Sequence, residues 1–491
     1  MIPLLLALAA FAQDGADVQP DGGLETFLAS QRAQWPDRGA PPPVAPATPW
    51  EQAAWTEHRL DNGVRVLHVP IEGLRKVSVQ VRRRTAPELL SLPPALRECV
   101  ELQGTATERH DQEALESALT LLDAELDVDS LGVESTDVWL TVPRDELEPG
   151  LSLLAEVLYT PVFPKSEVRR WLRNERFFWG QQLATDASTL ADVALRYGWY
   201  QPDTPQGTRR SAADYGALDP KDLRTLAAQL NTDAPVDVLI VGDVSWDALQ
   251  PMLSSTLAAA PGPKDTPAPA PLPTSTRAPR FIAVDVPGAE QAVVRYRLPA
   301  PPRGDADRLP FEALQWAYGG TFLSRLNRVL REDKGWTYGS YSSDTPHAAE
   351  GEFTVGYDTG VDTAADAIEQ TLTVLHALRG EGCTADELSG AWRESVAGWN
   401  QAALSASTAG SFYGAALEAD LTVDQARERL VAAGEVTTDT TRDVAGRWFA
   451  DTQPGVWVVV GDRERLEPEL AALGWTWEWY SAQQVARGLT D

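Results

Sequence analysis

The feature of this 491-residue sequence that most constrains its fold is an internal duplication. The first half contains VDVLIVGDVSWDALQPML and the second half contains GVWVVVGDRERLEPEL. Each stretch is a β-rich run, then Val-Gly-Asp, then the acidic start of a helix. Gly242 and Gly461 in these stretches lie 219 residues apart, counted from 242 to 461. A match over so long a period predicts two copies of one structural unit.

Apolar strands alternate with pairs of helices in both halves, which predicts an α+β fold of two homologous domains. Strand patterns in the first half are GVRVLHVP, KVSVQVRRR and ESTDVWLTVP. Helices are predicted there at about 93–103, 110–126, 144–158 and 165–184. The second half repeats the pattern with RFIAVDVP, AVVRYRLPA and GEFTVGYDTG. We therefore expect each domain to be a mainly antiparallel β-sheet packed on helices.

Two tracts rich in Pro and Ala, GAPPPVAPATP and APGPKDTPAPAPLPTSTRAPR, divide the chain. The N-terminal run MIPLLLALAAFA ends in a small-x-small pattern and is typical of a signal peptide, although it lacks a basic start. Export predicts a periplasmic or secreted protein, and without cleavage the protein would be cytoplasmic. The predicted division is a signal peptide (1–20), a lead-in (21–53), an N-terminal domain (54–262), a linker (263–280) and a C-terminal domain (281–491).

Composition excludes several classes of function. The chain carries 42 Lys and Arg against 71 Asp and Glu, a formal net charge of −29. Such a chain repels phosphate backbones, so nucleic acid is excluded as a partner and neutral or cationic peptides are favoured. Cys99 and Cys383 are the two cysteines, which excludes a disulfide scaffold, and the five histidines form no His-x-x-x-His pair. No stretch is long enough for stable membrane insertion.

Several motifs in order along the chain carry a family resemblance. They are LDNGVRVLHVP, a helix closing on QGT, GVESTDVWLTVPRDELEPGLSLLAEVLYTPVF, YQPDTPQGTRRS and, in the second half, GGTFLSRLNRVLREDKGWTYGSYSS. Together they resemble the insulinase, pitrilysin and mitochondrial processing peptidase family of zinc metallopeptidases. The resemblance covers about residues 54–491. It implies two homologous domains in a clam-shell arrangement around an unfolded peptide.

The resemblance also exposes a damaged zinc site. Active members carry His-x-x-Glu-His on the helix before the Gly-Thr, where the two His bind zinc and the Glu acts as general base. Counting back from Gly104, the two His positions hold Ala95 and Cys99, and Glu98 keeps the general-base position. The family's third ligand is a later Glu, and Glu175 lies 76 residues after Cys99. Because both His ligands are missing, we expect no bound cofactor, although the family uses zinc.

The remaining residues of this site have competing interpretations. A free Cys on the inner face of a helix is usually a small apolar side chain, and Cys99 is otherwise a metal ligand. Glu98 and Glu175 are either surface carboxylates in ion pairs or remnants with a chemical role. Four arginines at helical spacing around Glu175 offer it partners, namely Arg169, Arg170, Arg173 and Arg176.

The second half retains a different part of the family pattern. In the family an Arg and a Tyr seven residues apart bind the substrate backbone and the tetrahedral intermediate, and LREDKGWTY places Arg331 and Tyr338 at that spacing. Their fixed donors suit a carbonyl or an oxyanion. In the alternative interpretation, Arg331 ends a helix and Tyr338 packs on a strand.

The sequence thus predicts a catalytically inactive homologue, the substrate-binding subunit of a heterodimeric peptidase whose homologous partner carries an intact zinc motif. Its substrate would be an unfolded peptide, captured by strand addition. One alternative is an active zinc endopeptidase with a non-standard site of Cys99, Glu175 and His110. Another is a structural subunit, like the non-peptidase core subunits of the respiratory bc complex that share the fold.

Overall fold

The structure, a computed structural model, describes residues 46–263, 279–450 and 455–489, and Pro49–Asp491 form one compact unit. The expected signal peptide, most of the lead-in and most of the linker lie outside the described residues.

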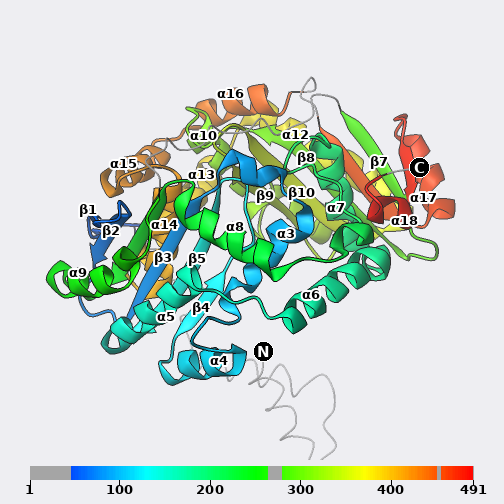
Figure 1. The fold of residues 1–491 in the computed structure, drawn as a ribbon. Coiled ribbons are helices and arrows are strands. Elements are labelled where there is room, and N and C mark those ends of the chain that lie inside the picture. Colours follow the sequence, from blue (N-terminus) through cyan, green and yellow to red (C-terminus); the bar gives the residue numbers. More distant parts are fainter. Residues whose placement is uncertain (1–45, 264–278, 451–454, 490–491) are drawn as a thin grey trace, which may run out of the picture. The chain divides into compact units, whose positions relative to one another are not determined.

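The first sheet has six strands (Figure 1). In spatial order they are β1 (Thr56–Arg59), β2 (Arg65–Pro70), β6 (Val236–Gly242), β3 (Lys76–Arg84), β5 (Ser135–Pro143) and β4 (Glu125–Val128).

The second sheet repeats the first. In spatial order its strands are β12 (Glu478–Ser481), β7 (Arg280–Asp285), β11 (Val456–Gly461), β8 (Gln291–Ala300), β10 (Gly351–Gly360) and β9 (Ser340–Pro346). In both sheets the second and third strands in this order are parallel and the following pairs are antiparallel. The first positions differ, because β1 precedes β2 as an antiparallel neighbour whereas β12 comes near the C-terminus and runs parallel to β7.

The duplicated Val-Gly-Asp stretches end the third strand of each sheet. Every residue of β6 and of β11 is buried. A run rich in valine and other apolar residues suits a strand that is covered on both faces, which explains why these two segments were the clearest repeat in the sequence. The prediction of two mainly antiparallel sheets packed on helices is confirmed.

The helices follow the same duplicated order. Those of the first half are α3 (Pro94–Cys99), α4 (Gln112–Leu121), α5 (Leu147–Tyr159), α6 (Lys165–Phe177), α7 (Ala187–Trp199), α8 (Pro220–Thr232) and α9 (Trp246–Ser255). Those of the second half are α10 (Arg308–Gln315), α11 (Arg325–Asn327), α12 (Ala364–Glu381), α13 (Ala385–Gln401), α14 (Ala406–Glu418), α15 (Val423–Ala433), α16 (Thr438–Trp448), α17 (Arg463–Ala472) and α18 (Ala482–Ala486).

Three of the predicted helices are shorter than expected. The helix predicted at 110–126 ends at Leu121, and the chain then enters strand β4. The helix predicted at 93–103 is α-helical to Cys99 and then tightens into a 3-10 turn, Val100–Gly104. The helix predicted at 165–184 ends at Phe177 and continues as a π-helical turn, Phe178–Gln182. Such turns are common at helix ends, where the last carbonyl groups lack partners four residues on. Within the described residues, no helix has both the length and the apolar character needed to cross a bilayer.

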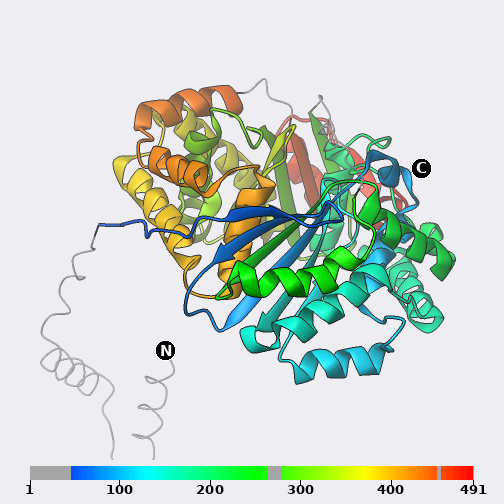
Figure 2. The same ribbon diagram turned by 60° about the vertical axis from the view of Figure 1, so that its left-hand side comes forward.

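One helix from each half packs on the sheet of the other half. Helix α7 of the first half packs on β11 and β8 of the second sheet, and α14 of the second half packs on β3 and β6 of the first sheet. Figures 1 and 2 show α14, in orange, lying against the blue strands of the first sheet. The contacts are close, because a Cβ built on Gly198 in α7 would lie 2.7 Å from Val456 Cγ1, and one on Gly410 in α14 would lie 2.4 Å from Ser78 Oγ.

The hydrophobic cores reflect this exchange. One core combines side chains of α3, α6 and α7 with β7, β8 and β11 of the second sheet. A smaller core combines β2 and β6 with Ala409, Tyr413 and Leu417 of α14. The opposite faces of the sheets are covered from within their own halves, by α5 and α9 in the first and by α10, α12 and α16 in the second. Neither half therefore completes its apolar core alone.

Candidate functional site

Helix α3 presents the expected zinc-ligand positions to the protein interior. Its first turn contains Pro94, which suits a helix start because its missing N–H needs no partner there. Ala95 and Cys99 lie one turn apart on the same face, and both are buried. The predicted positions are therefore on a helix and point the right way, but they belong to a packed apolar core.

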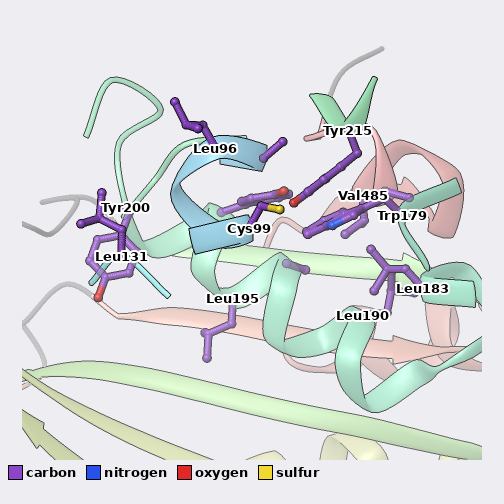
Figure 3. Close-up of a cluster of buried hydrophobic side chains, with 14 of the residues drawn as sticks. Leu96, Cys99, Leu131, Trp179, Leu183, Leu190, Leu195, Tyr200, Tyr215 and Val485 are labelled. Carbon is purple, nitrogen blue, oxygen red and sulfur yellow. The ribbon is translucent and has the colours of Figure 1, made fainter. Parts of the chain in front are cut away.

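Cys99 points into that core. Figure 3 shows its sulfur pointing toward Tyr215 and Trp179, whereas the Leu96 side chain points away from it. Burial, and then the negative charges of Glu101 and Glu175, raise the pKa of the Cys99 thiol to about 12. Because metals bind the thiolate, a thiol with this pKa is a poor ligand at neutral pH. The contacts favour the interpretation of Cys99 as a small apolar side chain.

Glu98 is engaged by an arginine and a tyrosine. Its Oε1 lies 2.6 Å from Nη2 of Arg210, and the Tyr215 hydroxyl donates to its Oε2 at 2.7 Å. Both side chains of the ion pair are 18% exposed. Burial and the Glu98 carboxylate raise the pKa of Tyr215 well above its usual value, so the hydroxyl keeps its proton. Glu98 therefore accepts fixed hydrogen bonds where a general base would need to face a water molecule.

The loop between α7 and α8 holds Arg210 in place. Its backbone N–H donates to the Tyr197 hydroxyl oxygen at 2.9 Å, and its guanidinium lies over the Trp179 ring, 6.0 Å from the centroid. Tyr215 stacks on the same ring with centroids 6.3 Å apart. A fixed positive charge thus lies beside the Glu98 carboxylate.

Glu175 lies close to the same group. Burial, followed by the negative charges of Glu98 and Glu101, raises the pKa of Glu175, and the positive charge of Arg210 lowers it. The expectation that neighbouring arginines of its own helix pair with Glu175 was wrong. Arg170 pairs with Glu167, and the cation that acts on Glu175 is Arg210 from a distant loop. Helical neighbours at these spacings point away from the face that carries Glu175.

These residues do not fit a zinc ion. Ala95 has no donor atom, Cys99 is a buried protonated thiol, and Glu175 alone is too few for a catalytic site that needs three protein ligands. His110, the ligand proposed for a non-standard site, binds Glu156 through Nδ1 at 2.8 Å. Among the described residues, no three His, Cys, Asp or Glu side chains gather closely enough to hold a metal ion.

Arg331 and Tyr338, the two site residues predicted in the second half, belong to a segment that exposes several aromatic and apolar side chains. Tyr338 is 93% exposed in the turn between the π-helical segment Arg328–Asp333 and β9. The guanidinium of Arg331 lies over the Phe322 ring, 4.1 Å from its centroid, and Nη1 lies 3.3 Å from Glu332. Phe322 and Leu323 are 61% and 78% exposed. Tyr338 therefore does not pack on a strand, and the aromatic ring under Arg331 restricts its guanidinium.

The structure brings the predicted residues into two groups. Glu98, Cys99 and Glu175 lie together in the first half, with Ala95 one turn away from Cys99. Arg331 and Tyr338 belong to one segment of the second half, seven residues apart in sequence, and within the described part of the chain no hydrogen bond or ion pair joins that segment to the first group. Sequence reasoning missed Arg210 and Tyr215, although Arg210 belongs to the YQPDTPQGTRRS motif that contributed to the resemblance.

A family profile described as "Peptidase M16 inactive domain" matches residues 217–394, which include the Arg331 and Tyr338 segment. The match covers a little over a third of the chain, and it supports the predicted resemblance to the insulinase and pitrilysin family. It also supports a catalytically inactive homologue, and the first half lacks both His ligands of the family's zinc motif.

Solved structures share the M16 fold of this chain. The peptidase M16 inactive domain from Pseudomonas fluorescens has a TM-score of 0.74 and 21% identity, covering 83% of this chain and 98% of that one. A protease from Helicobacter pylori has a TM-score of 0.73 and 17% identity, covering 84% and 100%. The periplasmic protease PqqL from Escherichia coli has a TM-score of 0.71 and 14% identity, covering 91% of this chain and 51% of PqqL. No curated protein sequence matches the chain.

Proposed function

We propose that this M16 homologue is the substrate-binding subunit of a heterodimeric peptidase that acts on unfolded peptides. The observation that carries the proposal is the contrast between its two groups of residues. The zinc-ligand positions are filled by Ala95 and Cys99 in a packed core, whereas Tyr338 is 93% exposed in the segment that follows Arg331. A subunit that offers donors without a metal site needs a partner chain that supplies the metal site.

Arg331 and Tyr338 would act on the peptide bond held by that partner. An arginine donates through a planar fork, and a tyrosine hydroxyl donates from a rigid ring. Donors of this kind bind a carbonyl oxygen and stabilise the negative charge that develops on it during cleavage. The zinc-bearing partner would supply the activated water. The exposed side chains of Phe322 and Leu323 offer an apolar surface beside the two donors.

Peptide capture would use an edge strand. β9 starts two residues after Tyr338 and is the last strand of its sheet, and β4 is the last strand of the other. Edge strands bind extended peptides through the backbone, which tolerates many sequences. On β4 the exposed side chains are Glu125 and Asp127, so a basic or neutral peptide suits this edge better than an acidic one.

A periplasmic location is part of the proposal. The N-terminal apolar run supports export, and PqqL, one of the similar structures, is a periplasmic protease. An envelope compartment would also expose the subunit to unfolded peptides outside the cytoplasm.

The test is reconstitution with a homologous chain from the same organism that carries His-x-x-Glu-His. Cleavage of fluorescein-labelled casein is measured for each chain and for the pair. We expect cleavage by the pair and none by this chain. In the pair, Tyr338→Phe or Arg331→Ala lowers kcat by about 100-fold, as removal of one oxyanion donor does.

A matched control comes from the same segment. Arg328→Ala removes an exposed arginine of the same π-helical turn as Arg331. It is expected to leave kcat within about twofold of the unmodified pair, because Arg328 has no part in the proposed site. Cleavage by this chain alone that a chelator abolishes would instead support a non-standard zinc endopeptidase and refute the proposal.

A further inference from the structure

A groove of about 650 Å³ lies between α6 and the start of α8. Its walls are one face of α6 and the segment Gly216–Pro220, which ends at the first residue of α8. Val168, Leu172 and Leu218 contribute an apolar floor. The groove is separate from the second-half group of Arg331 and Tyr338, and none of the residues around Glu98 lines it.

A row of four cations follows the α6 wall. Lys165, Arg169, Arg173 and Arg176 line the groove and recur every three or four residues, so they share one helix face. All four are exposed, and within the described part of the chain none forms an ion pair with a carboxylate. The single acidic side chain of the lining, Asp219, accepts from the backbone N–H of Lys221 and caps α8.

Two of these arginines are held by their own helix. Arg169 Nε donates to the Lys165 carbonyl oxygen at 3.0 Å, and Arg176 Nε donates to the Leu172 carbonyl oxygen at 3.3 Å. Each bond fixes the base of the guanidinium and leaves its two Nη groups for a ligand. Because a guanidinium presents parallel N–H groups, it matches the two oxygens of a carboxylate.

The row is anomalous for this chain. The protein carries a net charge of −29, so carboxylates are abundant, yet among the described residues none forms an ion pair with this row, and Asp219, the one carboxylate of the lining, caps α8. Like charges four residues apart, as at Lys165, Arg169 and Arg173, destabilise a helix. Repulsion of this kind is relieved when an acidic ligand lies along the row.

We propose that this groove binds an acidic peptide segment of a partner protein, with carboxylates on the cationic row and apolar side chains on the floor. From Lys165 to Arg176 the row covers 11 helical rises, which is about 16 Å and matches about five residues of an extended peptide. The apolar floor favours a peptide over a bare phosphate group, which has no apolar part to bury. The acidic remainder of the molecule disfavours a long nucleic acid.

The test is fluorescence anisotropy with the full chain and a short fluorescein-labelled peptide that alternates Glu and Leu. The same peptide with Gln in place of Glu measures the contribution of charge. We expect saturable binding of the Glu peptide that weakens with added salt, and at least about tenfold weaker binding of the Gln peptide. Arg169→Glu/Arg173→Glu should weaken binding of the Glu peptide by at least about tenfold, and Arg169→Lys/Arg173→Lys by less.

The matched control is Arg393→Glu/Arg427→Glu, which reverses two exposed arginines on α13 and α15 and changes the net charge by the same amount. It should leave the affinity within about twofold, because the net charge acts weakly at this distance. Circular dichroism confirms that each variant is folded. Equal losses in the two reversed variants, or no binding by the unmodified chain, would overturn the proposal. Binding of a single-stranded DNA oligonucleotide as tight as that of the Glu peptide would overturn the choice of a peptide ligand.

Discussion

The two halves of this molecule share one topology but differ in what their equivalent elements do. In the first half the segment before Gly104 contributes a buried helix in which Cys99 packs in the core and Glu98 pairs with Arg210. In the second half the segment around Arg331 exposes aromatic and apolar side chains. Equivalent parts of a duplicated fold thus differ in burial, because the first buries its side chains in a core and the second exposes apolar side chains to solvent.

Each half completes the apolar core of the other, through α7 and α14. Removing the large anchor of either helix should therefore weaken both halves at once. Trp199→Ala in α7 and Tyr413→Ala in α14 each remove a buried aromatic side chain and should cost about 3–5 kcal/mol of unfolding free energy. Calorimetry should show a single transition that moves as a whole. Two transitions, of which one moves, would show that the halves fold independently.

A smaller loss is expected from crowding the contact of α7 with the second sheet. A Cβ added at Gly198 would lie 2.7 Å from Val456 Cγ1 and 2.8 Å from Ile282 Cδ1, so Gly198→Ala should cost about 1–3 kcal/mol. The matched control is Gly398→Ala in α13, where nothing lies within 4 Å of the added atom. That variant should be stabilised by about 0.5–1 kcal/mol through helix propensity. Urea denaturation of both variants measures the difference, and similar changes would refute the close contact.

The caps of the exchanged helices should respond differently to pH. Asp186 accepts from Ser188 and Thr189 at the start of α7, and Ser405 caps α14. Either change to Ala should cost about 1 kcal/mol at neutral pH. Hydrogen bonds from the side chain and backbone of Thr189 lower the pKa of Asp186 below 3.8. The stabilisation of the folded protein by the charged Asp186 carboxylate is therefore present above pH 3.8, and it is lost as the pH falls through the lowered pKa of Asp186.

Thermal unfolding between neutral and acidic pH separates the two caps. The cost of Asp186→Ala should shrink on acidification relative to unmodified protein, whereas the cost of Ser405→Ala should stay constant, because a hydroxyl does not titrate in this range. Asp186→Asn keeps the cap without the charge and should remove the pH dependence. A pH-dependent cost at Ser405 would show that the effect arises elsewhere.

The smallest expected effect concerns the two cysteines, one in each half. Burial raises the pKa of both Cys99 and Cys383 to about 12. Neither should react with iodoacetamide at pH 8 in the folded protein, and both should react in urea. Mass spectrometry of the alkylated protein measures this. Rapid alkylation of Cys99 alone would show an accessible thiolate and reopen its role as a ligand.

Much of the fold was predictable because the strongest signals are local. The valine-rich runs that became β6 and β11, and their shared Val-Gly-Asp ends, gave the two sheets and their duplication. The exchange of α7 and α14 was not predictable, because an amphipathic helix shows which face is buried but does not identify the sheet that covers it.

The candidate site was predictable where spacing fixes geometry. The positions of Ala95, Cys99 and Glu98 on one helix follow from the helical period, and Glu175 does lie near them. The pairing of Glu98 with Arg210 and Tyr215 depends on the fold of a loop more than 110 residues away, counted from 98 to 210. Local sequence carries no information about such a contact, and so the arginines of α6 were chosen wrongly as partners of Glu175.

The central claim is that the first half has lost its zinc site while the second half keeps its donors. The most direct measurement is the zinc content of the purified chain after equilibration with zinc and dialysis, determined by inductively coupled plasma mass spectrometry for the unmodified chain and for Glu175→Gln. We expect far less than one zinc per chain, with no difference between the unmodified chain and Glu175→Gln. One zinc per chain that is lost on Glu175→Gln would contradict it.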